Sequence, residues 1–131
     1  MINYLTFEQI IRLHDSMIDN FGGLKGVRDA NLLLSSIESP MMAVFGEELY
    51  PTVYDKAAIY LFSIIRNHPF NDANKRTGAG AAYLFLQINK APIPFNDESF
   101  ENFVVKVAKG KITKEQIAHF LEYGKEIKKG P

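Results

Sequence analysis

The chain has 131 residues, 47% of them hydrophobic, which suits one domain with one core, and its 15 basic and 15 acidic residues give a net charge of zero. This balance provides no extended basic surface, so we expect neither direct DNA binding nor membrane binding. The absence of cysteine excludes disulfides, thiolate nucleophiles and cysteine-ligated zinc. No apolar stretch reaches about 18 residues and the first residues do not resemble a signal peptide, so we expect a cytoplasmic protein.

Apolar residues recur at helical spacing, and no strand-like alternation exceeds a few residues, so the sequence predicts an all-α fold. The first helix follows a capping box of Thr6 and Gln9 and ends at Gly22-Gly23. The second is capped by Asp29 and runs as far as Pro40. Both carry apolar residues along one face, as helices that pack on a core do.

Four further helices are predicted from apolar periodicity and capping residues. Their expected positions are from near Val53 to Asn67, from near Ala73 to about Asn89, from Asn96 or Asp97 to Gly110, and from a capping box of Thr113 and Gln116 onward. The predicted domain therefore covers residues 1–124. Residues 125–131 are expected to form a polar, frayed C-terminal tail.

The segment SPMMAVFGEELYPT, residues 39–52, separates the second and third helices and is called the flap below. It is apolar, is bounded by prolines and lacks a clear period. One interpretation is that its apolar side chains cover the core, namely Met41, Met42, Val44 and Phe45. The other is that it lies beside an active site as a flap or groove wall, where an extended peptide binds.

The segment HPFNDANKRTG, residues 68–78, joins the third and fourth helices through a short polar turn. Pro69 cannot continue the third helix, and Asn71 or Asp72 is expected to cap the fourth through a side-chain oxygen. Phe70 is apolar among polar neighbours, so it is expected to anchor the turn in the core. Gly78 and Gly80 in the following helix indicate a close helix crossing.

Two cations occupy the first turn of the fourth helix, where they oppose the helix dipole. An anion bound at the helix start would make this arrangement favourable. The Asn74 amide, the point charge of Lys75 and the forked Arg76 are together suited to a phosphate. Under the alternative interpretation these cations are only solvated, and His68 is a capping residue at a helix end.

The stretch HPFNDANKR resembles the Doc (death-on-curing) branch of the Fic superfamily, whose signature is His-x-Phe-x-Asp/Asn-Ala/Gly-Asn-Lys-Arg. Three other stretches resemble Doc proteins in order and spacing: LHD at 13–15, FGGLKGVRD at 21–29 and YLFLQIN at 83–89. The resemblance therefore covers nearly the whole chain. It implies a compact single-domain bundle of about six helices, in agreement with the periodicity.

Fic relatives that transfer AMP carry His-x-Phe-x-Asp/Glu-Gly-Asn-Gly-Arg-x-x-Arg, and this chain differs at three positions. Ala73 and Lys75 replace the two glycines, and Ala79 replaces the second arginine. Lys75 fills space and adds charge where the phosphates of a nucleotide approach the helix. These differences are those of the Doc type, which implies a toxin kinase that blocks translation by transferring the γ-phosphoryl group of ATP to a threonine of elongation factor Tu.

The resemblance also implies the role of each residue, with ATP and Mg²⁺ as cofactors. His68 is the base for the acceptor hydroxyl, Asp72 holds Mg²⁺ and Phe70 is structural. The phosphate and nucleotide ligands are Asn74, Lys75 and Arg76. Two further residues are left with alternatives: Arg66 faces either the cleft or solvent, and His14 is either a core residue, which its apolar helix face favours, or a functional one.

Many Fic enzymes inhibit themselves through a Ser/Thr-x-x-x-Glu-Gly/Asn segment. The nearest candidate here, Glu101-Asn102, is preceded four residues earlier by Asp97 instead of Ser or Thr. The resemblance therefore implies a separate Phd-like antitoxin, expected to bind near the flap and the first helix. Two other functions stay open: a Fic-type AMP or other nucleotidyl transferase, and an inactive Fic-fold binding module.

Overall fold

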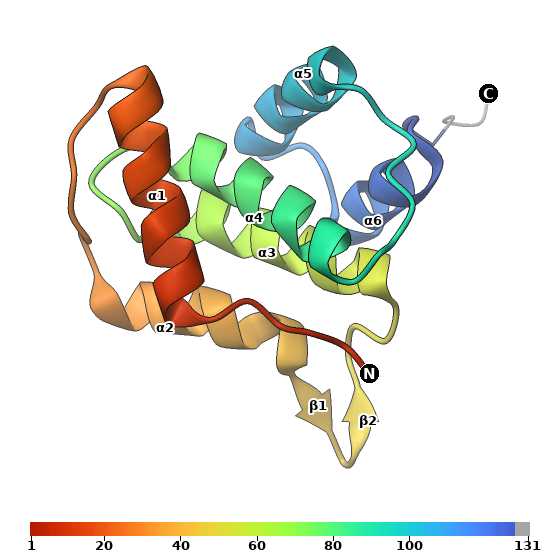
Figure 1. The fold of residues 1–131 in the computed structure, drawn as a ribbon. Helices are drawn as coiled ribbons and strands as arrows, with labels where there is room; N and C mark the ends of the chain where they lie inside the picture. The colour runs from red at the N-terminus through yellow and green to blue at the C-terminus, as the bar shows by residue number, and fades with distance from the viewer. Residues whose placement is uncertain (128–131) are drawn as a thin grey trace.

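The computed structural model describes residues 1–127, which form six α-helices, one 3₁₀ turn and one short hairpin (Figure 1). The helices are α1 (Phe7–Phe21), α2 (Ala30–Glu38), α3 (Val53–Asn67), α4 (Asn74–Ile88), α5 (Asp97–Ala108) and α6 (Lys114–Tyr123). The 3₁₀ turn η1 (Ser39–Met41) leads into β1 (Ala43–Val44) and β2 (Glu47–Glu48). The predicted all-α fold with six helices is confirmed.

Side-chain capping starts most of the helices where the sequence predicted them to start. The capping boxes Thr6–Gln9 and Thr113–Gln116 are both present, and Asp29 and Asn96 cap α2 and α5. A further capping box, between Thr52 and Asp55, starts α3. Each cap satisfies a backbone N–H group that has no partner within its own helix.

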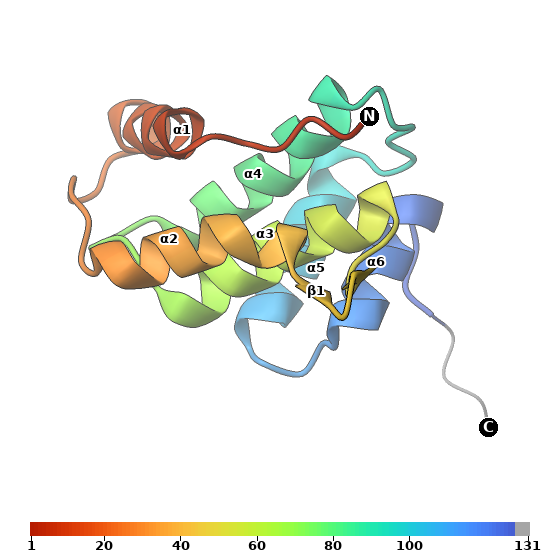
Figure 2. The same ribbon diagram turned by 90° about the horizontal axis from the view of Figure 1, so that it is seen from below.

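Helix α3 is the centre of the bundle, with nine of its fifteen residues buried, and it packs against α2, α4 and α6 (Figures 1 and 2). The crossing with α4 is close, because a Cβ atom at Gly78 would lie 3.3 Å from the Leu61 carbonyl oxygen. On the other side of α4, a Cβ atom at Gly80 would lie 2.9 Å from Met17 Cε of α1. The predicted close helix crossing is therefore confirmed on two faces of α4.

The flap contains η1 and the hairpin, which projects from the bundle beside the N-terminal end of α3 (Figure 1). The interpretation that its apolar side chains cover the core is wrong, since all four are 44–101% exposed: Met41, Met42, Val44 and Phe45. The positive φ angles of Phe45 and Gly46 form the hairpin turn and leave the Phe45 ring in solvent. Lys56 attaches the flap to α3, because its fully buried ammonium group donates hydrogen bonds to Glu48 Oε1 (3.0 Å) and to the Tyr50 carbonyl.

No helix within residues 1–127 is both long and apolar enough to cross a membrane. The predicted polar tail lies partly outside the described residues. Its described part includes Glu126, whose carboxylate pairs with Lys106 at 2.7 Å.

Candidate active site

The turn between α3 and α4 contains two residues other than glycine in the left-handed conformation. His68 ends α3 with φ 47° and ψ 57°, and Ala73 precedes α4 with φ 60° and ψ 28°. Each such residue costs about 1–3 kcal/mol, so surrounding contacts must stabilise the turn. Strain of this kind is common at functional sites.

Two buried rings, those of Phe70 and His14, hold the turn on the core. The Phe70 ring is 1% exposed and stacks on His14, with the ring centroids 3.9 Å apart and the planes at 6°. His14 is itself buried, and its Nε2 lies 2.9 Å from the Asp72 carbonyl oxygen. The predicted anchor at Phe70 is present, and His14 is a core residue whose packing supports the turn.

Asn74 closes the turn on itself. Its amide accepts a hydrogen bond from the Phe70 N–H and donates one to the Phe70 carbonyl, both at 3.0 Å. The side chain is 8% exposed. Asn74 therefore braces the turn, and its contact with phosphate stays a prediction.

The segment between α1 and α2 runs beside the turn and fixes it from the side (Figure 1). Val27 and Phe70 form an antiparallel bridge, and the Asn71 N–H donates to the Gly26 carbonyl at 3.0 Å. The Arg28 guanidinium donates from Nε to the His68 carbonyl (2.6 Å) and from Nη2 to the Asn67 carbonyl (2.8 Å). Arg28 thus binds the C-terminal carbonyls of α3 at the residue expected to be the base.

Sequence reasoning did not identify Arg28 as part of the site. It was noted only within FGGLKGVRD, a stretch that resembles Doc proteins. The available signal was the three glycines that precede it, Gly22, Gly23 and Gly26, which indicate a segment of special backbone geometry and not a plain linker. Nothing in the local pattern shows that Arg28 reaches a turn forty residues further along the chain.

Asp72 faces the segment between α1 and α2 instead of capping α4. Its Oδ2 accepts from the Leu24 N–H at 3.1 Å and its Oδ1 from the Ala73 N–H at 2.8 Å. These two N–H groups, that of Leu24 first, hold the pKa of Asp72 below its ordinary value, so the carboxylate is ionised at neutral pH. Gly23 makes room for it, because a Cβ atom at Gly23 would lie 2.6 Å from Asp72 Oδ2.

The prediction that Asn71 or Asp72 caps α4 is therefore wrong. The N-cap residue is Ala73, and no side chain bonds to the first turn of the helix. Within the described residues the other five α-helices all have a side-chain cap. Within the described residues, the N–H groups at the start of α4 thus have no side-chain acceptor, as an anion site requires.

The two cations of the first turn of α4 have different surroundings. The Lys75 ammonium is exposed, and no ion pair among residues 1–127 involves it. The Arg76 guanidinium reaches the end of α1, where it donates to the carbonyls of Met17 (3.2 Å) and Gly22 (3.1 Å). Arg76 therefore also stabilises the negative end of the α1 dipole, whereas Lys75 has no structural partner.

One cavity of about 430 Å³ brings the predicted site residues together. It is lined by the residues of the turn and of the α4 start, namely His68, Asn71, Asp72, Ala73, Asn74, Lys75 and Arg76. The His68 side chain is exposed and forms no hydrogen bond within the described chain. Arg66 does not line this cavity but a separate groove along α3.

The donor atoms in the cavity fit a magnesium ion held mainly by a nucleotide. Asp72 is the only carboxylate lining it, and no group of three or more His, Asp or Glu side chains in residues 1–127 is arranged to hold a metal. Each Asp72 oxygen accepts one hydrogen bond and keeps a free lone pair. One carboxylate with phosphate and water oxygens is a normal ligand set for Mg²⁺.

Comparison with known proteins identifies the family of this chain. A model of the Fic/DOC family matches residues 4–86, which is more than half of the chain. This chain therefore belongs to the Fic/DOC family.

Two curated relatives extend the similarity beyond the matched region. The chain is 33% identical over 120 residues to "Protein kinase doc" of Escherichia phage P1, which covers 92% of this chain and 94% of that protein. It is 39% identical over 110 residues to "Toxin Doc" of Mycolicibacterium smegmatis (strain ATCC 700084 / mc(2)155), which covers 82% of each. The expected resemblance to Doc proteins is confirmed.

Proposed function

We propose that this protein is a Doc-like toxin kinase, which transfers the γ-phosphoryl group of ATP to a threonine of elongation factor Tu and so blocks translation. The main support is the placement of Lys75: an unpartnered ammonium stands beside the uncapped N–H groups of α4, in the cavity that also contains His68. AMP-transferring relatives have glycine at this position. The names of the two relatives, a kinase and a toxin, favour the same function.

In this mechanism His68 takes the proton of the threonine hydroxyl, since no side-chain hydrogen bond to another described residue occupies its exposed ring. The hydroxyl oxygen forms a bond to the γ-phosphorus, the bond from that phosphorus to the bridging oxygen breaks, and ADP leaves. Lys75, Arg76 and the N–H groups at the start of α4 bind the phosphates and stabilise their charge. Asp72 would hold Mg²⁺, which neutralises phosphate charge when bound.

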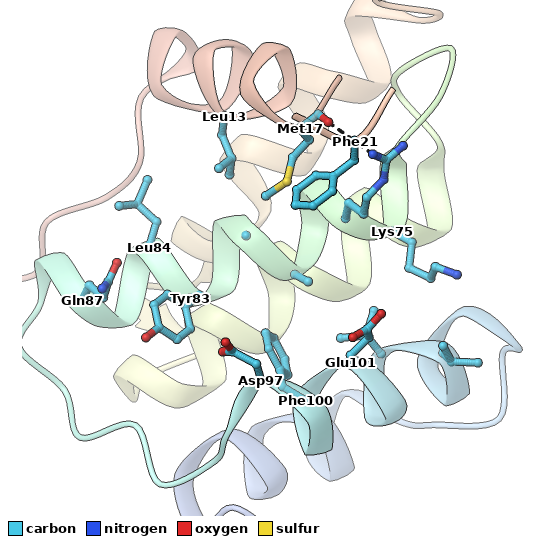
Figure 3. Close-up of a pocket in the computed structure, with 15 residues that line it drawn as sticks. Leu13, Met17, Phe21, Lys75, Tyr83, Leu84, Gln87, Asp97, Phe100 and Glu101 are labelled. Atoms are coloured by element: carbon cyan, nitrogen blue, oxygen red, sulfur yellow. Dashed lines mark hydrogen bonds between the residues drawn. The ribbon is translucent and has the colours of Figure 1, made fainter. Parts of the chain in front are cut away.

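We propose that an antitoxin of the Phd kind binds an apolar groove of about 650 Å³ between α1, α4 and α5 (Figure 3). Met17 and Phe21 of α1 face Phe100 of α5 across this groove. The first helix is therefore a suitable receptor, whereas no residue of the flap lines this groove. Lys75 and Arg76 line both the groove and the cavity of His68, so a bound segment would also obstruct the active site.

Labelled ATP tests the proposed reaction. Purified elongation factor Tu is incubated with the protein, Mg²⁺ and ATP labelled at either the α- or the γ-phosphate. The proposal predicts label on the factor from γ-labelled ATP only, and none with the His68→Ala variant. Label from α-labelled ATP would instead identify an AMP transferase, and no label from either form would favour an inactive binding module.

A further inference from the structure

A second groove, here called the α3 groove, begins beside the active site. It has a volume of about 490 Å³ and is lined by side chains of α2, α3 and α6, with Asn67 of α3 at one end and Met42 and Tyr50 of the flap at the other. Asn67 directly precedes His68. The groove therefore extends from the flap to the residue that precedes the proposed catalytic base.

Two cations converge on one aromatic ring in this groove. The Lys114 ammonium nitrogen lies 5.1 Å and the Arg66 guanidinium carbon 5.7 Å from the centroid of Phe62. Lys114 Nζ also lies 3.2 Å from the Tyr50 hydroxyl oxygen. Packing on aromatic faces holds both cations in defined positions.

No carboxylate neutralises these cations in the described structure. Neither Arg66 nor Lys114 forms an ion pair within residues 1–127, and no acidic side chain lines the α3 groove. Lys114 is moreover the first residue of α6, where a cation opposes the helix dipole. An anion between the two side chains would reduce both the repulsion between the cations and the repulsion between Lys114 and the α6 dipole.

We propose that the α3 groove binds an acidic segment of the protein substrate, with a carboxylate between Arg66 and Lys114. This inference rests on the proposed function and names the recognition element for its acceptor. The phosphates of ATP already have a site at the start of α4, so the second anion site serves another partner. The exposed apolar side chains of the flap border the groove and suit a polypeptide better than a nucleic acid, and the chain has no net positive charge.

The geometry also gives the register of the acceptor. Phe62 lies six residues before His68, a rise of about 9 Å along a helix. An extended chain spans about 3.3 Å per residue. If the acceptor chain runs extended along α3, an acidic side chain held over Phe62 therefore lies about three residues from the threonine that receives the phosphoryl group.

Steady-state kinetics with elongation factor Tu test this surface. The Arg66→Ala/Lys114→Ala double variant is expected to raise the KM for the factor about tenfold, the effect of losing two exposed ion pairs, with kcat and the KM for ATP nearly unchanged. The matched control is Lys109→Ala/Lys125→Ala, which removes the same charge from exposed positions outside the groove. Equal KM values for the factor in both double variants, or a rise in the KM for ATP instead, would overturn the proposal.

A binding measurement separates this inference from the proposed reaction. Isotope-labelled wild-type protein without ATP is titrated, under NMR observation, with a short peptide that carries glutamate three residues from threonine. The expected result is a set of shifts at Phe62, Arg66 and Lys114 that is absent when glutamine replaces the glutamate. No shift in the groove, or a stronger response to poly(U) RNA than to the peptide, would overturn the acidic-segment site even if elongation factor Tu is phosphorylated. Conversely, groove shifts with a factor that is not phosphorylated would contradict only the proposed acceptor.

Discussion

Arg28 donates two hydrogen bonds, one of them 2.6 Å long, to the backbone carbonyls of His68 and its neighbour, and so fixes the left-handed end of α3. We predict that Arg28→Ala lowers kcat by ten- to a hundredfold, because a displaced base loses its alignment. The expected loss of unfolding free energy is about 1–2 kcal/mol. Transfer kinetics and urea unfolding measure the two effects.

Two variants make this prediction specific. Arg28→Lys should recover activity only in part, since one ammonium group lacks the fork that spans two carbonyls. Lys25→Ala removes an exposed cation of the same segment, one that pairs only with Asp19 at 3.2 Å, and should leave kcat unchanged. An Arg28→Ala variant with wild-type kcat would show that the contact only fastens two loops.

The second prediction concerns His68 itself. His68→Ala should abolish transfer and keep the fold, because the side chain is exposed and no described residue bonds to it. Far-ultraviolet circular dichroism and the melting temperature report the fold, and labelled ATP reports transfer. Loss of helicity together with activity would favour a structural role for this histidine.

The third prediction separates the two cations of α4. Lys75→Ala should change the unfolding free energy by less than about 0.5 kcal/mol but lower transfer by about a hundredfold, because no ion pair among residues 1–127 involves Lys75. Arg76→Ala should also destabilise the fold by about 1–2 kcal/mol, since it loses the carbonyls of Met17 and Gly22. Urea unfolding measures both variants. If Lys75→Ala were less stable than Arg76→Ala, the assignment of a structural role to Arg76 and not to Lys75 would be refuted.

The fourth prediction follows from the lowered pKa of Asp72. A carboxylate whose pKa is lower in the folded state adds stability above its unfolded pKa, at about pH 4, and this stability is lost as the pH falls through the folded value. Asp72→Asn should therefore be less stable than wild type at neutral pH, and the difference should shrink below about pH 4. Urea unfolding across this range measures it, and a difference that grows toward low pH would contradict the assignment.

The sequence was sufficient for the helices and for the position of the turn, because both depend on local signals. Thr6, Asp29, Asn96 and Thr113 act within one helical turn of their own positions, and Phe70 is apolar in a polar stretch. These features can be predicted without knowledge of the tertiary structure. The site residues from His68 to Arg76 likewise share one cavity because they share one turn.

The wrong cap assignment and the missed Arg28 both depend on contacts between distant segments. Asn71 or Asp72 was expected to cap α4, but the Leu24 N–H, 48 residues away in sequence, binds the Asp72 carboxylate instead. Arg28 was missed for the same reason. The flap could be interpreted as a cover for the core because its composition is apolar. In the structure the buried Lys56 binds the C-terminal part of the flap, and the apolar side chains of the flap stay in solvent.

Mass spectrometry of elongation factor Tu after incubation with the protein, ATP and Mg²⁺ tests directly whether this protein transfers a phosphoryl group to the factor. We expect one added phosphoryl group on one threonine with the wild-type protein, none with His68→Ala, and strongly reduced modification with Lys75→Ala. An AMP adduct on the factor, or an unmodified factor in the presence of the wild-type protein, would contradict it.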